Sequence, residues 1–472
     1  MTTTTARRDA QLPLGLALTF AATSLPLAGL GIAAAVHLPA YFAANIGVEL
    51  VVVGAAFGLV RLIDVPVEPM LGLAMDRSRT RWGRYRVWTI AGVPLVMLGL
   101  YMLLVAGQGV GQGYLIAWLL VMYLGISILM LAHSAWASTL AKTYNDRARL
   151  FGVMAAVGVA GAVSVLTIPI VMERMGYAES EGVRAMIWTL MVLAPAAVAI
   201  VVWRTPETVT PERPGQRFRW RDYVELVTDP NMARIILADL ALSFGPASMA
   251  ALYIFFFRDF LRFTPGQANL LLLFYIISGV VGAPTLAWLA TRISKHRTVM
   301  LACAIYSLLI VSFAFLPKGN IIGALPTMFM TGFLAAGFNV LTRAMTADVA
   351  DEMRLRQGKE RSGLLYALTT LTTKFAQGGS IFLIFSVLDW RGFDAKLGQA
   401  NTPEAMQALV LCGVAVPVVF VMLGAVCLIG YKLTAERAAE VRRQLEERDA
   451  LHEEEASIES LAAPGQIAPL RP

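Results

Sequence analysis

Three ionisable residues share one face of an otherwise apolar stretch near the start of the chain. Arg61, Asp64 and Glu68 lie at spacings of three and four residues within RLIDVPVEPMLGLAMDR. In a helix this spacing places their side chains on nearly the same face. Two carboxylates one turn apart in low dielectric repel each other, which raises the proton affinity of one unless a cation lies between them. The pattern therefore predicts a cation site at Asp64 and Glu68.

The same residues also allow a structural interpretation, in which Asp64 pairs with Arg61 or with another helix and only fixes packing. Two acids against one arginine leave a negative remainder, which favours the cation site. A charged side chain at the centre of a membrane helix costs about 3 kcal/mol even on the lenient insertion scale. We therefore expect the cluster to face the protein interior or a wet cavity.

The composition is that of a membrane protein. The chain has 472 residues, of which 57% are hydrophobic and only 15% are charged,. Its net charge of +7 does not indicate a nucleic-acid partner, because the basic residues are scattered over short loops between apolar spans,. Cys303, Cys412 and Cys427 lack metal-ligand or redox spacing,. No phosphate loop, nucleophile set or metal quartet is visible, so the sequence favours neither an enzyme nor a bound cofactor.

Apolar runs of about 20 residues, the length that crosses the hydrocarbon core, predict an all-α membrane protein with twelve spans,. The predicted spans are 12–36, 46–75, 88–107, 113–141, 150–172, 184–203, 233–257, 266–290, 298–316, 320–345, 363–388 and 405–432. Lys and Arg are concentrated in the loops that follow the even-numbered spans, whereas the opposite loops are nearly bare. By the positive-inside rule, both termini are expected in the cytoplasm of a bacterial-type inner membrane.

A long loop rich in proline and charge divides the predicted spans into two groups of six. The expected organisation is an N-terminal half over 1–203, a cytoplasmic linker over 204–232, a C-terminal half over 233–432 and a charged, solvated cytoplasmic tail over 433–472,.

A faint repeat supports two related halves. The second span ends in EPMLGLAMDR and the eighth in APTLAWLATR, with Pro, a small residue and Arg at identical spacing. Parallel repeats of this kind are typical of the major facilitator fold. The second half has Gly279 and Ala283 where the first has Asp64 and Glu68, so the acidic site belongs to the N-terminal half alone.

Lys374 lies in the middle of the eleventh span, within TTLTTKFAQGGS. An ammonium at that depth needs an anion, and the acidic pair on the second span is the obvious candidate. A lysine that only extends to the membrane interface is the alternative. We expect Arg61 and Lys374 to couple cation binding to substrate binding.

Other polar residues support weaker hypotheses. Thr23 on the first span and His133 and Trp136 on the fourth are tentative substrate-binding residues, although a buried His or a lone Trp more often belongs to the core. Asp239 is ambiguous because it lies near the predicted cytoplasmic end of the seventh span. Several charged residues at the cytoplasmic ends of the spans could form ion pairs between the halves and so act as a tentative cytoplasmic gate. The alternative is that they belong to ordinary solvated loops. They are Asp76, Arg84, Asp348, Asp351 and Arg361.

The motifs resemble those of a known family. The run from Arg61 through Asp76, followed by RTRWGRYRVW, is similar to the signature of the glycoside-pentoside-hexuronide:cation symporters, the melibiose-carrier-like branch of the major facilitator superfamily. The ADVADE segment, Arg361 and Lys374 resemble the second signature of that family, and the similarity covers essentially all twelve spans. The resemblance implies a cation site at Asp64 and Glu68 and a helix-eleven lysine, matched by Lys374, that connects cation and substrate sites.

The chain departs from this family in three places. Sugar-binding members carry acids on helices one and four, but the first span here has none, and the fourth-span position falls near Ala132 and His133. The helix-four hydroxyl that helps to hold sodium is expected to be missing, with Leu129 close to the matching place. Glu68 replaces the Asp that is common in sugar carriers.

These observations predict a monomeric secondary active transporter that carries a small solute by cation-coupled symport. The expected substrate is a sugar, glycoside or uronate, and the coupling ion is sodium or a proton. A carrier of lysolipids or other amphipathic solutes, and an exporter or antiporter on the same fold, remain alternatives. A receptor or scaffold would instead predict that neutralising Asp64 and Glu68 leaves function intact. Membrane lipid is an expected partner and nucleic acid is not.

Overall fold

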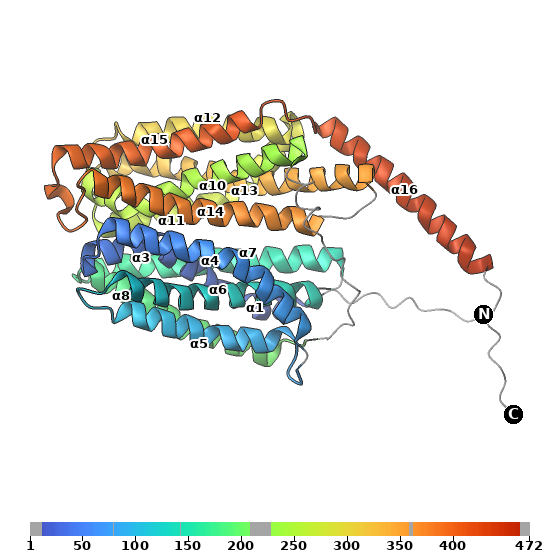
Figure 1. The fold of residues 1–472 in the computed structure, drawn as a ribbon, viewed down its shortest axis with the longest axis horizontal. Helices are drawn as coiled ribbons and strands as arrows, with labels where there is room; N and C mark the ends of the chain where they lie inside the picture. The colour runs from blue at the N-terminus through green and yellow to red at the C-terminus, as the bar shows by residue number, and fades with distance from the viewer. Residues whose placement is uncertain (1–11, 79, 142, 208–227, 358–361, 463–472) are drawn as a thin grey trace.

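The computed structural model describes residues 12–78, 80–141, 143–207, 228–357 and 362–462, and within them the chain is helical, with no β-strand (Figure 1). Over this described part, twelve helices are long and apolar enough to cross a membrane, which confirms the number of spans predicted from the sequence.

The first span is built from five short segments, whereas the later spans are mostly single helices. The first-half segments are α1 (Leu14–Ala21), α2 (Ser24–Ile32), the π-helix η1 (Ala33–His37), α3 (Leu38–Tyr41), the π-helix η2 (Phe42–Ile46), α4 (Leu50–Arg77), α5 (Tyr85–Leu104), α6 (Gln112–Leu140), α7 (Tyr144–Arg174) and α8 (Glu179–Arg204). The later segments are α10 (Pro230–Phe255), the π-helix η3 (Phe256–Phe260), α11 (Pro265–Ile293), α12 (Lys295–Phe313), α13 (Ile321–Gln357), α14 (Ser362–Trp390), the short 3-10 helix η4 (Gly398–Ala400), α15 (Pro403–Cys427) and α16 (Ala435–Ala462).

Two predicted boundaries differ markedly from the structure. The first span continues to Ile46 instead of ending at 36, because His37 is buried and the chain passes through two π-helical segments without leaving the bundle. The tenth span continues as α13 to Gln357, well beyond the predicted end at 345. The predicted linker, 204–232, lies largely outside the described residues.

The helices form two layers that run along the long axis of the molecule (Figure 1). Helices α1 to α8 make one layer and α10 to α15 make the other. We call the end from which α16 projects the α16 end, and the opposite end, where α14 is joined to α15, the far end. Helices α4 and α14 pack together across the two layers, as do α7 and α11.

The contact between α4 and α14 depends on glycine. A Cβ added to Gly58 would lie 3.2 Å from the carbonyl oxygen of Gly378, and a Cβ added to Gly378 would lie 3.2 Å from the carbonyl oxygen of Gly58. The two backbones therefore approach more closely than larger residues allow. Lys374 lies one helical turn before Gly378, so this contact brings its side chain to the charged face of α4.

The sequence predicts a solvated tail, but helix α16 is buried along one face. Ala438, Val441 and Leu445 are buried, and their spacing places them on one face of the helix,. Arg442 Nη2 lies 2.9 Å from Asp348 Oδ1, and Arg448 Nη1 donates to the carbonyl oxygen of Arg354 at 3.3 Å. The tail helix therefore docks on the extension of α13.

Candidate functional site

Lys374 joins the two halves of the molecule at the acidic pair. Its ammonium, on α14, lies 2.6 Å from Glu68 Oε1 and also contacts Asp64 Oδ2, both on α4. Asp64 is 3% exposed and Lys374 is 12% exposed. A shared ammonium relieves the repulsion between the two carboxylates. The structure thus brings together the two predicted cation-site residues and the predicted coupling lysine.

Arg61 occupies the other side of Asp64. Its Nη1 lies 3.8 Å from Asp64 Oδ2, and its guanidinium carbon lies 4.2 Å from the centre of the Tyr123 ring. The cation–π contact holds the guanidinium against α6. The two acids are therefore balanced by two basic side chains. The net negative charge expected from α4 alone is neutralised by Lys374.

A hydroxyl from α6 completes the surroundings of Asp64. Ser127 Oγ donates a hydrogen bond to Asp64 Oδ1 at 2.7 Å. The sequence analysis expected a helix-four hydroxyl to be missing, with Leu129 near its place, and that expectation is wrong. Leu129 is buried and its side chain lies against Gly92 of α5 instead. A serine two residues earlier in an apolar span was the signal that could have identified this residue.

This arrangement can bind a small cation or a proton only by exchange. Asp64 and Glu68 supply hard oxygen ligands of the kind that sodium prefers, and Ser127 adds a neutral oxygen. The ammonium of Lys374 occupies the position that such a cation would take. A bound cation, or a proton on one acid, would therefore compete with Lys374 for these oxygens.

A cavity of about 310 Å³ lies between the halves next to this cluster. Arg61 and Tyr123 line it from the first half, and the remaining polar lining comes from α10, α11, α13 and α14. Arg61 contacts both Asp64 and the cavity, so it links the cation site to the space where a solute can bind. The volume is at the low end of the ~300–1,000 Å³ typical of small-molecule sites.

The three tentative substrate residues do not line this cavity. His133 stacks on Phe20, with ring centroids 4.5 Å apart, and its Nε2 lies 3.2 Å from Ser24 Oγ. Trp136 packs edge-on against the same Phe20 ring at 5.6 Å. Thr23 is fully buried. We therefore assign His133 and Trp136 to packing inside the first half, because their helix face turns away from the interface between the halves.

The contacts that can be described for Asp348, Asp351 and Arg84 stay within one half or reach the tail. Asp348 accepts from Lys295 at 2.5 Å and from Arg442 at 2.9 Å, and Asp351 lies 3.6 Å from Arg442. Arg84 Nε donates to the carbonyl oxygen of Met75 at 3.1 Å. The side chain of Asp76 and all of Arg361 lie outside the described residues. The structure does not bring the described members together as one gate.

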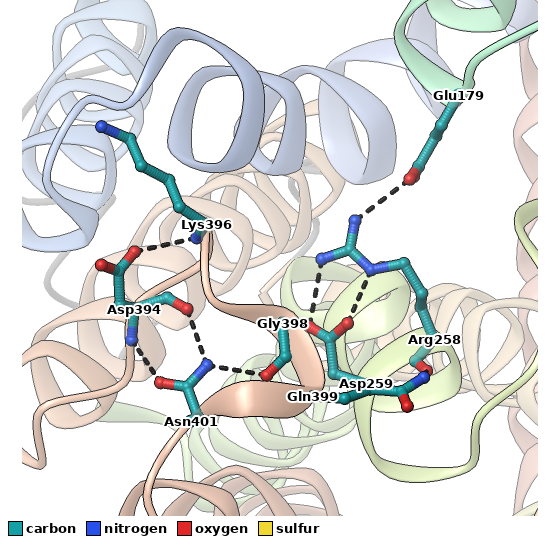
Figure 2. A network of polar contacts seen from close by, with 8 residues as sticks. All are labelled: Glu179, Arg258, Asp259, Asp394, Lys396, Gly398, Gln399 and Asn401. Atoms are coloured by element: carbon teal, nitrogen blue, oxygen red, sulfur yellow. Dashed lines mark hydrogen bonds and ion pairs between the residues drawn. The ribbon is translucent and has the colours of Figure 1, made fainter.

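An ion pair between the halves lies instead at the far end, where the sequence analysis proposed none. Figure 2 shows Arg258 between Glu179 of the first half and Asp259 of its own half. Its Nη1 lies 3.0 Å from Glu179 Oε2, and its Nε lies 2.6 Å from Asp259 Oδ1. The adjacent charges of Arg258 and Asp259 at the end of an apolar span could have drawn attention to this site. Their partner, Glu179, lies on another helix and cannot be recognised from the sequence.

A second contact closes the same end. The backbone N–H of Gly266, in the first turn of α11, donates to the Glu173 carboxylate at the end of α7. A carboxylate at a helix N-terminus is stabilised by the free N–H groups and the helix dipole. Lys396 also reaches across to the first half, where it lies against Gly47, a residue with φ of +81°.

These features define an integral membrane transporter of the major facilitator fold. A crystal structure of the nucleoside transporter NupG, a point mutant, matches with a TM-score of 0.68 and 12% identity over 87% of this chain and 99% of that one. The sequence profile of the family described as MFS/sugar transport protein matches residues 19–435. The chain belongs to this family.

Two curated relatives are similar over most of their lengths. The isoprimeverose transporter of Lactiplantibacillus pentosus is 23% identical over 421 residues, which is 84% of each chain. The glucuronide carrier protein homolog of Escherichia coli K12 is 22% identical over 433 residues, which is 88% of this chain and 91% of that protein. These relatives confirm the resemblance to the glycoside-pentoside-hexuronide:cation symporters.

Proposed function

We propose that this protein is a cation-coupled symporter that moves a sugar, glycoside or uronate across a bacterial inner membrane by alternating access. The observation that carries the proposal is the ammonium of Lys374, which bridges Asp64 and Glu68 from the opposite half beside a central cavity. The isoprimeverose and glucuronide names of the relatives support the substrate class. Apart from the coupling ion, this proposal requires no cofactor, and it includes no chemical reaction.

In this mechanism the coupling ion competes with Lys374. Sodium or a proton neutralises Asp64 and Glu68, which releases the lysine and changes the position of Arg61 at the cavity. Substrate then binds to the rearranged cavity, and the loaded protein changes state. Coupling follows because cation and substrate each bind one state better than the other.

The proposed orientation places the α16 end in the cytoplasm. The basic loop after α4 and the basic C-terminal turn of α13 lie at this end, as the positive-inside rule requires,. Arg258 and Glu179 join the halves at the far end, which is the outer side in this orientation, and this contact supports an inward-facing arrangement as part of the proposal. We propose that the transporter acts as a monomer, with its solute and membrane lipid as its partners.

Proteoliposomes test this function. Uptake of isoprimeverose, methyl xyloside, melibiose and methyl glucuronide would be measured with an inward or an outward gradient of sodium or of protons, and with no gradient. The wild type and the Asp64→Asn, Glu68→Gln double variant would be compared. We expect one gradient to drive accumulation of at least one sugar in the wild type only. Accumulation driven solely by an outward gradient would indicate an antiporter. Absence of all sugar uptake, or equal uptake by the double variant, would overturn the proposal.

A second candidate function is transport of an amphipathic solute such as a lysolipid. A groove of about 340 Å³ lies between α4 and α14, and its lining is apolar apart from Arg61, Gln112 and Lys374. Leu59, Leu62, Phe375 and Phe382 each expose between 43% and 48% of their surface along it. Sodium-driven uptake of lysophosphatidylcholine, with no uptake of the four sugars, would favour this candidate over the first.

A further inference from the structure

Asp239 is a buried acid that the cation site does not use. It lies nine residues into α10, about 14 Å from the start of the helix at 1.5 Å per residue, and it is 4% exposed,. It lines the central cavity from the second half, across from Arg61. The sequence analysis placed it near the cytoplasmic end, within reach of water, but the structure places it deep in the bundle.

The hydrogen-bonding neighbours of Asp239 are hydroxyl groups, and the charge of Arg343 also acts on its carboxylate. Thr372 Oγ1 donates to Asp239 Oδ2 at 2.5 Å, and Thr373 Oγ1 lies 3.5 Å from the same oxygen. Thr342 of α13 is a third hydroxyl beside the carboxylate. Among the residues that the structure describes, Asp239 has no salt bridge. An ionised carboxylate at this depth is costly without a cation or several hydrogen-bond donors.

The threonines satisfy Asp239 only in part. Each hydroxyl has a single proton to donate. Thr372 Oγ1 and Thr373 Oγ1 both also lie within hydrogen-bond distance of the carbonyl oxygen of Thr369, at 2.8 and 3.0 Å. A proton given to that carbonyl is not available to Asp239. The carboxylate therefore has unused capacity for donors that arrive from the cavity.

We propose that Asp239 is the substrate-anchoring carboxylate of this transporter and that it accepts hydrogen bonds from two neighbouring hydroxyls of a sugar ring. This inference rests on the proposed function. A pair of adjacent hydroxyls matches the two oxygens of a carboxylate, and such charge-assisted bonds are stronger than neutral ones. Asn339 and Gln377 line the same cavity and offer amide groups to further hydroxyls.

The rest of the cavity wall suits a sugar ring. Tyr275 and Phe338 line it with aromatic surface, which packs against the apolar face of a pyranose,. A second inorganic cation site fits less well, because oxygen ligands must surround such an ion at about 2.3–2.6 Å, whereas Asp239 faces a cavity of about 310 Å³. Substrate recognition therefore lies mainly in the second half, and cation recognition lies in the first.

The experiment compares wild type, Asp239→Asn and Asp239→Glu in proteoliposomes. The probe is the best-transported methyl glycoside of xylose, glucose, galactose or glucuronic acid, together with its monodeoxy analogues. We expect Asp239→Asn to raise KM about 10- to 100-fold, the range expected for loss of hydrogen bonds to a charged group. The wild type should discriminate against one or two deoxy analogues, and Asp239→Asn should not. Asp239→Glu should restore part of that discrimination.

Controls separate the possible outcomes. Ser248→Ala changes another buried polar residue of α10, whose hydroxyl bonds only to the Gly245 carbonyl within its own helix, and it should leave KM unchanged. An unchanged KM in Asp239→Asn would overturn the inference. So would unchanged sugar discrimination combined with an altered cation requirement, which would identify a second cation site. If the wild type transports no glycoside, the proposed function itself has failed.

Discussion

The two ends of the molecule use their charged residues differently. At the far end, Arg258 pairs with Glu179 and the Gly266 amide binds Glu173, so both contacts join the first half to the second. At the α16 end, Lys295 and Arg442 converge on Asp348 without leaving the second half and its tail.

This difference identifies which contacts belong to one state of the transporter and which are permanent. Contacts between the halves must break when the far end opens, whereas contacts within a half can persist through the whole cycle. The Lys374 bridge lies between the two ends. Three substitutions, described in order of expected effect, test this division.

The largest effect is expected from Lys374→Gln. Removing one partner of a buried ion pair costs about 3–5 kcal/mol, and each 1.4 kcal/mol is a factor of about ten. We therefore expect concentrative sugar uptake in proteoliposomes to fall at least about 100-fold, because the acids no longer exchange an internal ammonium for the coupling ion. Lys318→Gln is the control and should retain uptake, because the Lys318 ammonium lies over the Phe260 ring of its own half. Concentrative uptake by Lys374→Gln would contradict a coupling role.

A smaller effect is expected from Glu179→Gln. The pair with Arg258 is partly exposed, so its loss is worth about 0.2–1 kcal/mol, or up to about fivefold in the population of the outward-facing state. The measurement uses a variant without the three native cysteines and with Ala35→Cys in the cavity wall. An impermeant maleimide is added to whole cells that express it, and the rate at which the new cysteine is labelled is recorded.

Glu181→Gln provides the matched control for that experiment. Glu181 is on the same helix, but its salt bridge is with Arg184, 3.8 Å away in the same half. The Glu181→Gln substitution should leave the labelling rate of the cavity cysteine unchanged. Equal rates for Glu179→Gln and the parent protein would show that the far-end pair does not hold the halves together.

The smallest effect on transport is expected from Arg442→Gln. This residue ties α16 to Asp348, which keeps Lys295 as its other partner. Sugar uptake should stay within about twofold, the scale of an exposed pair, while limited trypsin digestion removes α16 faster. Arg443→Gln is the control, because Arg443 pairs only along its own helix, with Glu440 and Glu447. A large loss of uptake would show that α16 takes part in the transport cycle.

The sequence was most informative where charge occurs in an apolar span. Asp64, Glu68 and Lys374 were found because ionisable groups at that depth must have partners, and only a few were available. The number of spans followed from hydropathy for a similar reason, since every span must cover the same hydrocarbon thickness.

Hydropathy and charge do not tell which face of a helix points toward the site, so residues whose role depends on that orientation could not be predicted. Ser127 and Leu129 lie on the same apolar helix, and only the packing of α6 decides which one faces Asp64. His133 and Trp136 are unusual residue types for their span, yet their face turns into the first half. The Arg258–Glu179 pair joins helices far apart in sequence, and no local pattern records such a contact.

The Gly58–Gly378 contact has a mechanical consequence. It is a backbone-to-backbone contact between the halves, one turn from Lys374, in the first third of α4 and near the middle of α14. Glycine leaves the two backbones in direct contact, beside the Cβ atoms of Arg61 and Phe382, and this close approach lets the helices rock on one another. The contact can therefore serve as a pivot. If each half turns about it as a rigid body, opening one end closes the other, and a continuous leak path through the membrane is excluded by geometry.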